Sequence, residues 1–152
     1  MKKTGFLFLL GASLNVQGFA QKITPENVPV VVSDAFKVKF TTAEKASWEM
    51  DYDKYEASFK MNKVVVSAKF DKDGQWLQTE TPVNHFNLPP AVKACLSKQF
   101  DVYKENYIEK LETSEGISYE FEITYNEMEY EVSITEKGEL VKKMQVREYK
   151  KD

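Results

Sequence analysis

The sequence predicts an α+β protein in which two helices pack on one face of an antiparallel sheet of about eight strands. Three observations predict this fold. Apolar residues recur at helical spacing in 28–40 and 88–100, the segments between them alternate apolar and polar residues, and the whole pattern occurs twice along the 152 residues. We therefore expect a tandem repeat in which each unit is one helix followed by four antiparallel strands.

The two copies of the strand region align without a gap when 54–77 is placed on 118–141, an offset of 64. Matching positions in this alignment are Tyr55 and Tyr119, Asn62 and Asn126, Phe70 and Ile134, and Gly74 and Gly138. The helical segments align at an offset of 60, so four extra residues lie between Ile108 and Tyr119. Because common solenoid repeats are shorter, we interpret the pattern as two copies of one unit, at about 26–82 and 86–150.

Each predicted helix has one apolar stripe. The stripe of the first contains Val28, Val31, Val32, Ala35, Phe36 and Phe40, and that of the second contains Val92, Cys95, Leu96 and Phe100. Pro29 suits a first helical turn, where its missing N–H group is not needed. Cys95 aligns with Ala35, so we interpret it as a small packing residue rather than a reactive thiol.

Turn signals separate the predicted strands. Asn62-Lys63 and Asn126-Glu127 are placed where two-residue hairpin loops are expected, because Asn tolerates a left-handed backbone. Asp71 to Gly74 form a longer turn in which Gly74, like Gly138, supplies a positive φ angle. The last strand of each unit is predicted from about Trp76 to Thr81 and from Leu140 to Tyr149.

The first twenty residues predict export. Lys2 and Lys3 precede an apolar run from Gly5 to Leu14 that is too short to span a bilayer, and small residues lie before Gln21. We interpret residues 1–20 as a signal peptide cleaved after Ala20. The expected product is a periplasmic protein, residues 21–152, that forms a single domain and has no membrane segment after cleavage.

Charge and cysteine content exclude some classes of function. Without Lys2 and Lys3, 19 basic residues face 24 acidic ones, a net charge of −5. Phosphate binding needs clustered Lys and Arg, so we expect no nucleic-acid partner. One cysteine cannot form an intramolecular disulfide, and no motif for a cofactor or metal occurs, so none is expected.

The sequence offers few catalytic groups. His85 is the single histidine and lies in the linker between the two units, ten residues from Cys95. A Ser-His-Asp or Cys-His arrangement would require this histidine as its base. Asp71-x-Asp73-Gly74 is similar to the start of a calcium loop, but the residue at the position of the bidentate Glu is Pro82. We therefore interpret it as a hairpin turn and predict that the protein is not an enzyme, with no catalytic residues and no metal site.

A set of motifs covers nearly the whole chain after residue 20. They are Val28-Pro29 with Ala35-Phe36, Trp48, Tyr55-Glu56-Ala57 with Phe59, Asp71 to Gly74 before Trp76-Leu77, Thr79-Glu80, and Leu88-Pro89 with Val92. With these motifs the chain resembles the PepSY-like family of small, β-lactamase-inhibitor-like periplasmic proteins found in Bacteroides-type bacteria. The resemblance implies a tandem α+β unit whose sheet faces outward. The inhibitors carry a disulfide in each repeat, whereas Cys95 stands alone here.

The segment 104–139 is the most acidic part of the chain, with eleven Glu and three Lys, a net charge of −8. Four of its glutamates alternate outward on two predicted strands, and a two-residue loop between these strands would place Glu122 opposite Glu131. Lys143 on the next strand could lie beside Glu131 and offset the repulsion between these like charges. The four candidate binding residues are Glu120, Glu122, Glu129 and Glu131. They form either a solvated face or a patch for a basic partner or a divalent cation.

Two functions from different classes follow from these observations. The first is a non-catalytic periplasmic binding or inhibitory module that docks a protein or peptide on its open sheet face. The alternative is a binder of a small ligand or divalent cation that uses the acidic face of the second unit. Neither a partner nor a ligand can be identified from the sequence.

Overall fold

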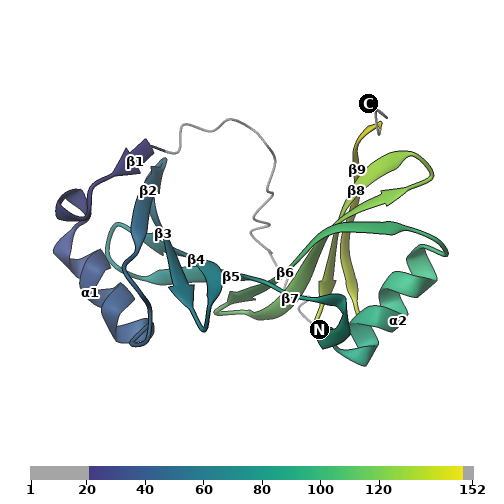
Figure 1. Ribbon diagram of the computed structural model, residues 1–152, viewed down its shortest axis with the longest axis horizontal. Helices are drawn as coiled ribbons and strands as arrows, with labels where there is room; N and C mark the ends of the chain where they lie inside the picture. The colour runs from purple at the N-terminus through teal and green to yellow at the C-terminus, as the bar shows by residue number, and fades with distance from the viewer. Residues whose placement is uncertain (1–20, 149–152) are drawn as a thin grey trace, which may run out of the picture.

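The computed structural model describes residues 21–148 and contains one antiparallel sheet of nine strands (Figure 1). Each strand pairs with the next along the chain, from β1 to β9. The strands are β1 Gln21–Ile23, β2 Ser47–Asp51, β3 Lys54–Met61, β4 Val64–Asp71, β5 Trp76–Pro82, β6 Lys104–Thr113, β7 Gly116–Tyr125, β8 Met128–Thr135 and β9 Leu140–Glu148. The helices are α1 Val30–Lys39 and α2 Pro90–Gln99, and a short 3₁₀ turn precedes each, Pro25–Asn27 and His85–Asn87.

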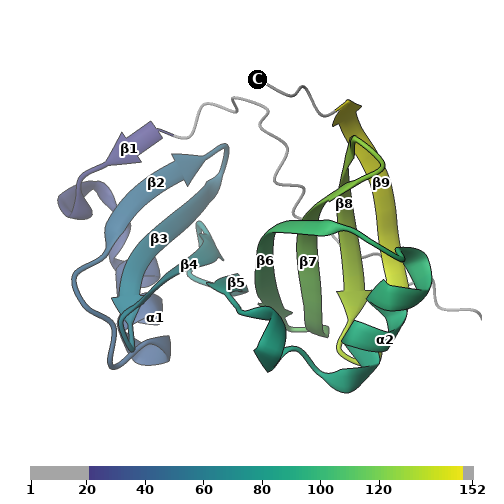
Figure 2. The same cartoon turned by 45° about the vertical axis from the view of Figure 1, so that its right-hand side comes forward.

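Strand register places both helices on the same face of the sheet. Ala57 belongs to the core under α1, and it pairs with Ala68, which pairs with Thr79 on β5. Thr81, two residues further along β5, pairs with Lys110 on β6, and Lys110 pairs with Tyr119 in the core under α2. Because side chains two residues apart point to one side of a strand, the two cores share a face. Each helix covers a different half of the twisted sheet, so the two helices lie at opposite ends of the molecule (Figures 1 and 2).

Each helix has its own hydrophobic core. Phe36 of α1 meets Phe59 with ring centroids 5.0 Å apart and Trp48 at 5.4 Å. Phe100, which follows α2, meets Tyr125 at 5.2 Å. Such edge-to-face ring pairs add to the free energy gained by burying apolar area. The two separate cores leave the opposite face of the sheet without a helix.

The predicted helical stripes are confirmed with one exception. Val32 and Val92 are fully buried, and Cys95 is partly buried against the second core. Val31 is half exposed, because the helix turns it toward the Gly74 turn instead of the sheet. Each helix also begins two residues later than its apolar stripe, because the 3₁₀ turn and the following proline hold the first residues outside the α-helix.

The predicted turns are confirmed. Asn62-Lys63 and Asn126-Glu127 all have positive φ angles between 50° and 68°, as a type I′ hairpin requires. Gly74 and Gly138 have φ angles of +82° and +85°. A Cβ atom on Gly138 would lie 2.6 Å from the carbonyl oxygen of Ala91, so glycine is needed for space as well as for backbone conformation.

The sheet has nine strands instead of the expected eight. The additional strand, β1, pairs Ile23 with Trp48 at the edge of the first unit, and three residues are too few for a visible alternation. The two halves share an element order of 3₁₀ turn, helix and four strands, and the pairs Trp48 with Ala57 and Ile108 with Phe121 occupy comparable places. Their common origin stays a prediction. The expected signal peptide, 1–20, lies outside the described residues.

Within residues 21–148, neither helix has the length and apolar composition that crossing a bilayer requires.

Candidate functional site

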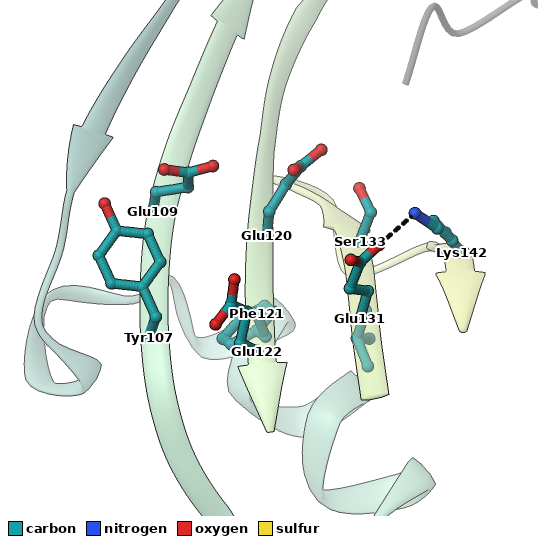
Figure 3. A pocket seen from close by; sticks show the side chains of 9 residues that line it. Tyr107, Glu109, Glu120, Phe121, Glu122, Glu131, Ser133 and Lys142 are labelled. Atoms are coloured by element: carbon teal, nitrogen blue, oxygen red, sulfur yellow. Dashed lines mark hydrogen bonds and ion pairs between the residues drawn. The ribbon is translucent and has the colours of Figure 1, made fainter. Parts of the chain in front are cut away.

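The face of the sheet opposite the helices carries a group of carboxylates in the second half of the chain (Figure 3). Strand alternation sends them there, because Ile108, Phe121 and Val132 point into the core and their neighbours point the other way. A small hollow, which we call the acidic hollow, is lined by Tyr107, Glu109, Glu120, Phe121, Glu122, Glu131, Val132, Ser133 and Lys142. Its volume of about 30 Å³ accommodates about one water molecule.

Register brings like charges together in the acidic hollow. Glu109 on β6 pairs directly with Glu120 on β7, and Glu122 on β7 pairs directly with Glu131 on β8. Directly opposed like charges destabilise a sheet by a few tenths of a kcal/mol to about 1 kcal/mol. One cation offsets this repulsion, since the ammonium of Lys142 lies 2.7 Å from a carboxylate oxygen of Glu131.

Burial strongly perturbs two of these carboxyl groups. Glu109 is 8% exposed, and its burial, with the nearby charge of Glu80, raises its pKa to about 7 against the opposing effect of a hydrogen bond from Tyr107. Burial, together with the charges of Glu109 and Glu80, raises the pKa of Glu120 to about 7. The acidic hollow therefore changes its charge near neutral pH.

Tyr107 closes one side of the acidic hollow. Burial and the neighbouring carboxylate of Glu109 raise the pKa of its hydroxyl to about 12, so the hydroxyl stays protonated and donates a hydrogen bond to Glu109. Tyr107 as a whole remains 42% exposed. The hollow therefore combines carboxylates with an accessible aromatic surface.

The charged face continues across the first half of the sheet. Glu80 on β5 accepts a hydrogen bond of 2.9 Å from the Ser67 hydroxyl on β4, and Lys69 lies 3.6 Å from Glu56. Burial raises the pKa of the Glu56 carboxyl, although Lys69 opposes this shift. Strands β3 to β9 thus present charged side chains on one face without a covering helix.

Three of the four predicted site residues line the acidic hollow. Glu120, Glu122 and Glu131 meet there, and the predicted pairing of Glu122 with Glu131 is confirmed. Glu129 pairs in register with Thr124 and is not among the lining residues.

The prediction of Lys143 as the cation beside Glu131 was wrong by one residue. Register shifts between β8 and β9, so Lys142 contacts Glu131, whereas Lys143 points to the other face and lies 4.3 Å from the centre of the Phe100 ring. The sequence also did not reveal Tyr107 and Glu109. One signal could have revealed them. It is the alternation along this strand of Tyr107, Glu109 and Leu111 with Ile108 and Lys110.

The candidate catalytic groups have structural contacts. The Nδ1 atom of His85 is hydrogen-bonded to Glu105, which also accepts from the Tyr103 hydroxyl at 3.3 Å. Asp71 accepts backbone hydrogen bonds from Asp73 at 2.9 Å and from Gln75 at 2.8 Å, which confirms the hairpin turn. Across residues 21–148, no three His, Cys, Asp or Glu side chains are grouped as metal ligands would be.

Solved structures share the fold of an antiparallel sheet with helices on one face. A protein from Bacteroides eggerthii, described as "putative periplasmic proteins", superposes with a TM-score of 0.73 at 22% identity, over 79% of this chain and 90% of that one. A "BLIP-like protein" from Bacteroides fragilis has a TM-score of 0.71 at 23% identity, over 78% of this chain and 86% of that one. At these identities the similarity shows the fold.

Residues 53–142 match the protein family described as "Putative beta-lactamase-inhibitor-like, PepSY-like", and the chain belongs to this family. The resemblance stated from the sequence is thereby confirmed. No curated protein matches the chain.

Proposed function

We propose that this protein is a non-catalytic periplasmic module, built from two related units, that docks a basic segment of a protein or peptide on its open sheet face. The observation that carries the proposal is the acidic hollow. Four glutamates and one lysine line it, so the site keeps a net negative charge near pH 7 even though Glu109 and Glu120 are partly protonated there. A complementary surface with Lys or Arg residues would remove the repulsion between Glu109 and Glu120.

The family and its structural neighbours support this proposal. The family description names inhibitor-like proteins, and the neighbour from Bacteroides eggerthii is described as periplasmic. A sheet face without a helix offers an area on which a protein could bind, and Tyr107 supplies an exposed aromatic ring of the kind that is frequent at interfaces. The export signal predicted in residues 1–20 would deliver the domain to the same compartment.

The test compares two doubly substituted forms of the chain 21–152. Glu120→Gln with Glu122→Gln replaces two carboxyl groups of the acidic hollow, and Glu115→Gln with Glu136→Gln replaces the same number in exposed turns. Each form is immobilised and exposed to periplasmic extract at low and high salt. We expect capture of a partner by the unmodified and turn forms, weakened by salt, and its loss in the hollow form.

Equal capture by both forms would contradict the proposed site. Capture that requires a divalent cation and disappears with EDTA would instead support the cation-binding alternative. Glu131 is left unchanged in this design, because its substitution would leave the half-buried ammonium of Lys142 without its carboxylate.

A further inference from the structure

A second cavity lies where the two halves of the chain meet. We call it the junction cavity, and it is lined by Pro82, Val83, Asn84, His85, Glu105, Asn106, Tyr107 and Ile108. Its volume of about 370 Å³ falls within the range of small-ligand pockets. Tyr107 lines both this cavity and the acidic hollow, so the two sites are neighbours on either side of one ring.

The junction cavity exists because β5 ends before its partner strand does. The last residue of β5, Pro82, pairs with Glu109, whereas β6 already begins at Lys104. Beyond Pro82 the chain leaves the sheet after one further hydrogen bond, from the Val83 N–H to the Ile108 carbonyl at 3.1 Å. The strand edge next to residues 105–108 therefore faces the linker across a gap instead of a neighbouring strand.

Three of the hydrogen-bond donors around this cavity already have partners. The Tyr107 hydroxyl donates to Glu109, and the side-chain N–H of Asn106 donates to the Thr124 hydroxyl at 2.9 Å. The Nδ1 atom of His85 contacts Glu105. A carboxylate oxygen can only accept, so this contact places a proton on Nδ1.

Several acceptors of the lining remain available. His85 and Tyr103 both contact Oε1 of Glu105, which leaves Oε2 for another donor. The amide oxygen of Asn106 and, in the neutral ring, the Nε2 atom of His85 are acceptors as well. The exposed ring of Tyr107 forms a wall that attracts cations. A ligand rich in donors and positively charged is the chemical complement of this lining.

We infer that the junction cavity binds the guanidinium group of an arginine side chain, supplied by the partner that the proposed function requires. Guanidinium is planar, carries five donors and no acceptor, and stacks on aromatic rings. In the junction cavity it meets Glu105, Asn106 and the Tyr107 ring. A second basic residue of the same segment would reach the acidic hollow on the other side of Tyr107.

The test uses N-acetyl-L-arginine amide as the probe and N-acetyl-L-citrulline amide as its neutral control of the same shape. Each is titrated into the ¹⁵N-labelled chain 21–152, and amide chemical shifts are followed by NMR. We expect saturable, millimolar binding of the arginine compound, with the largest shifts in 83–85 and 105–108, and at least about tenfold weaker binding of the citrulline compound.

Two variants complete the experiment. Glu105→Gln keeps an acceptor for His85 but removes the charge, and it should weaken binding of the arginine compound by about tenfold. The matched control is Glu112→Gln on the same strand, outside the cavity, where Glu112 lies 3.0 Å from Lys110. It should leave binding unchanged.

Equal binding of the arginine and citrulline compounds, shifts located elsewhere, or full binding by the Glu105 variant would each overturn this inference. If partner capture still depends on the acidic hollow while the arginine compound does not bind, the junction cavity is refuted and the proposed function stands. If the arginine compound binds as expected but no partner is captured through the acidic hollow, the proposed function is refuted and the junction cavity stands as a guanidinium site.

Discussion

Replacing Glu109 with Gln should stabilise the domain at pH 8 and change its stability little at pH 4.5. The folded state raises the pKa of this carboxyl from 4.5 to about 7, so between these values the folded protein retains a proton that the unfolded chain has released. Stability from this group is therefore fully present below pH 4.5 and is lost as the pH rises through 7. A glutamine stays neutral and avoids the loss.

The size of the effect follows from the shift. At 1.36 kcal/mol per pKa unit, the ionised carboxyl costs at most about 3 kcal/mol above pH 7. Urea unfolding at several pH values measures it, with the unmodified chain losing stability between pH 4.5 and 8 and the variant losing less. Glu115→Gln, in an exposed turn, is the control and should follow the unmodified chain. A Glu109 variant that is destabilised equally at both pH values would refute the reasoning.

Other substitutions test the turns and the ion pair. Gly138→Ala should cost about 2 kcal/mol or more, because the new methyl group would meet the Ala91 carbonyl and φ is +85°. Gly116→Ala, where no atom lies within 4 Å, should cost less, and equal melting temperatures for both variants would contradict this. Substitution of Glu131 and Lys142 by Gln, singly and together, should give a coupling free energy of about 1 kcal/mol in a double-mutant cycle; purely additive losses would show that the pair contributes no coupling.

Local patterns predicted most of the secondary structure. The apolar stripes of 28–40 and 88–100 reflect the helical period, and both turn asparagines reflect a backbone preference of their own residue type. The pairing of Glu122 with Glu131 could also be predicted. A two-residue loop at Asn126-Glu127 leaves one possible register for β7 and β8.

The prediction of the cation beside Glu131 failed because a strand contains an extra residue. The register shifts between Glu105 and Tyr107 of β6, where it meets β7, and between Ser133 and Ile134 of β8, where Val141 of β9 is the extra residue. Each shift changes which side chains are neighbours across strands. The second shift exchanged Lys142 for Lys143 beside Glu131. Hydrophobic alternation alone does not locate such irregularities, because one bulge displaces the pattern without ending the strand.

The sequence by itself determined the fold class, the two helices, the hairpin turns and the acidic character of the second half. These properties depend on residues near one another in the chain, whose spacing is visible directly. Only the tertiary structure decided that Glu109 meets Glu120, that His85 contacts Glu105 twenty residues away, and that β5 ends short of β6 to leave the junction cavity. Each of these contacts depends on register, twist or strand length across the sheet, where burial also sets the pKa values of the carboxyl groups.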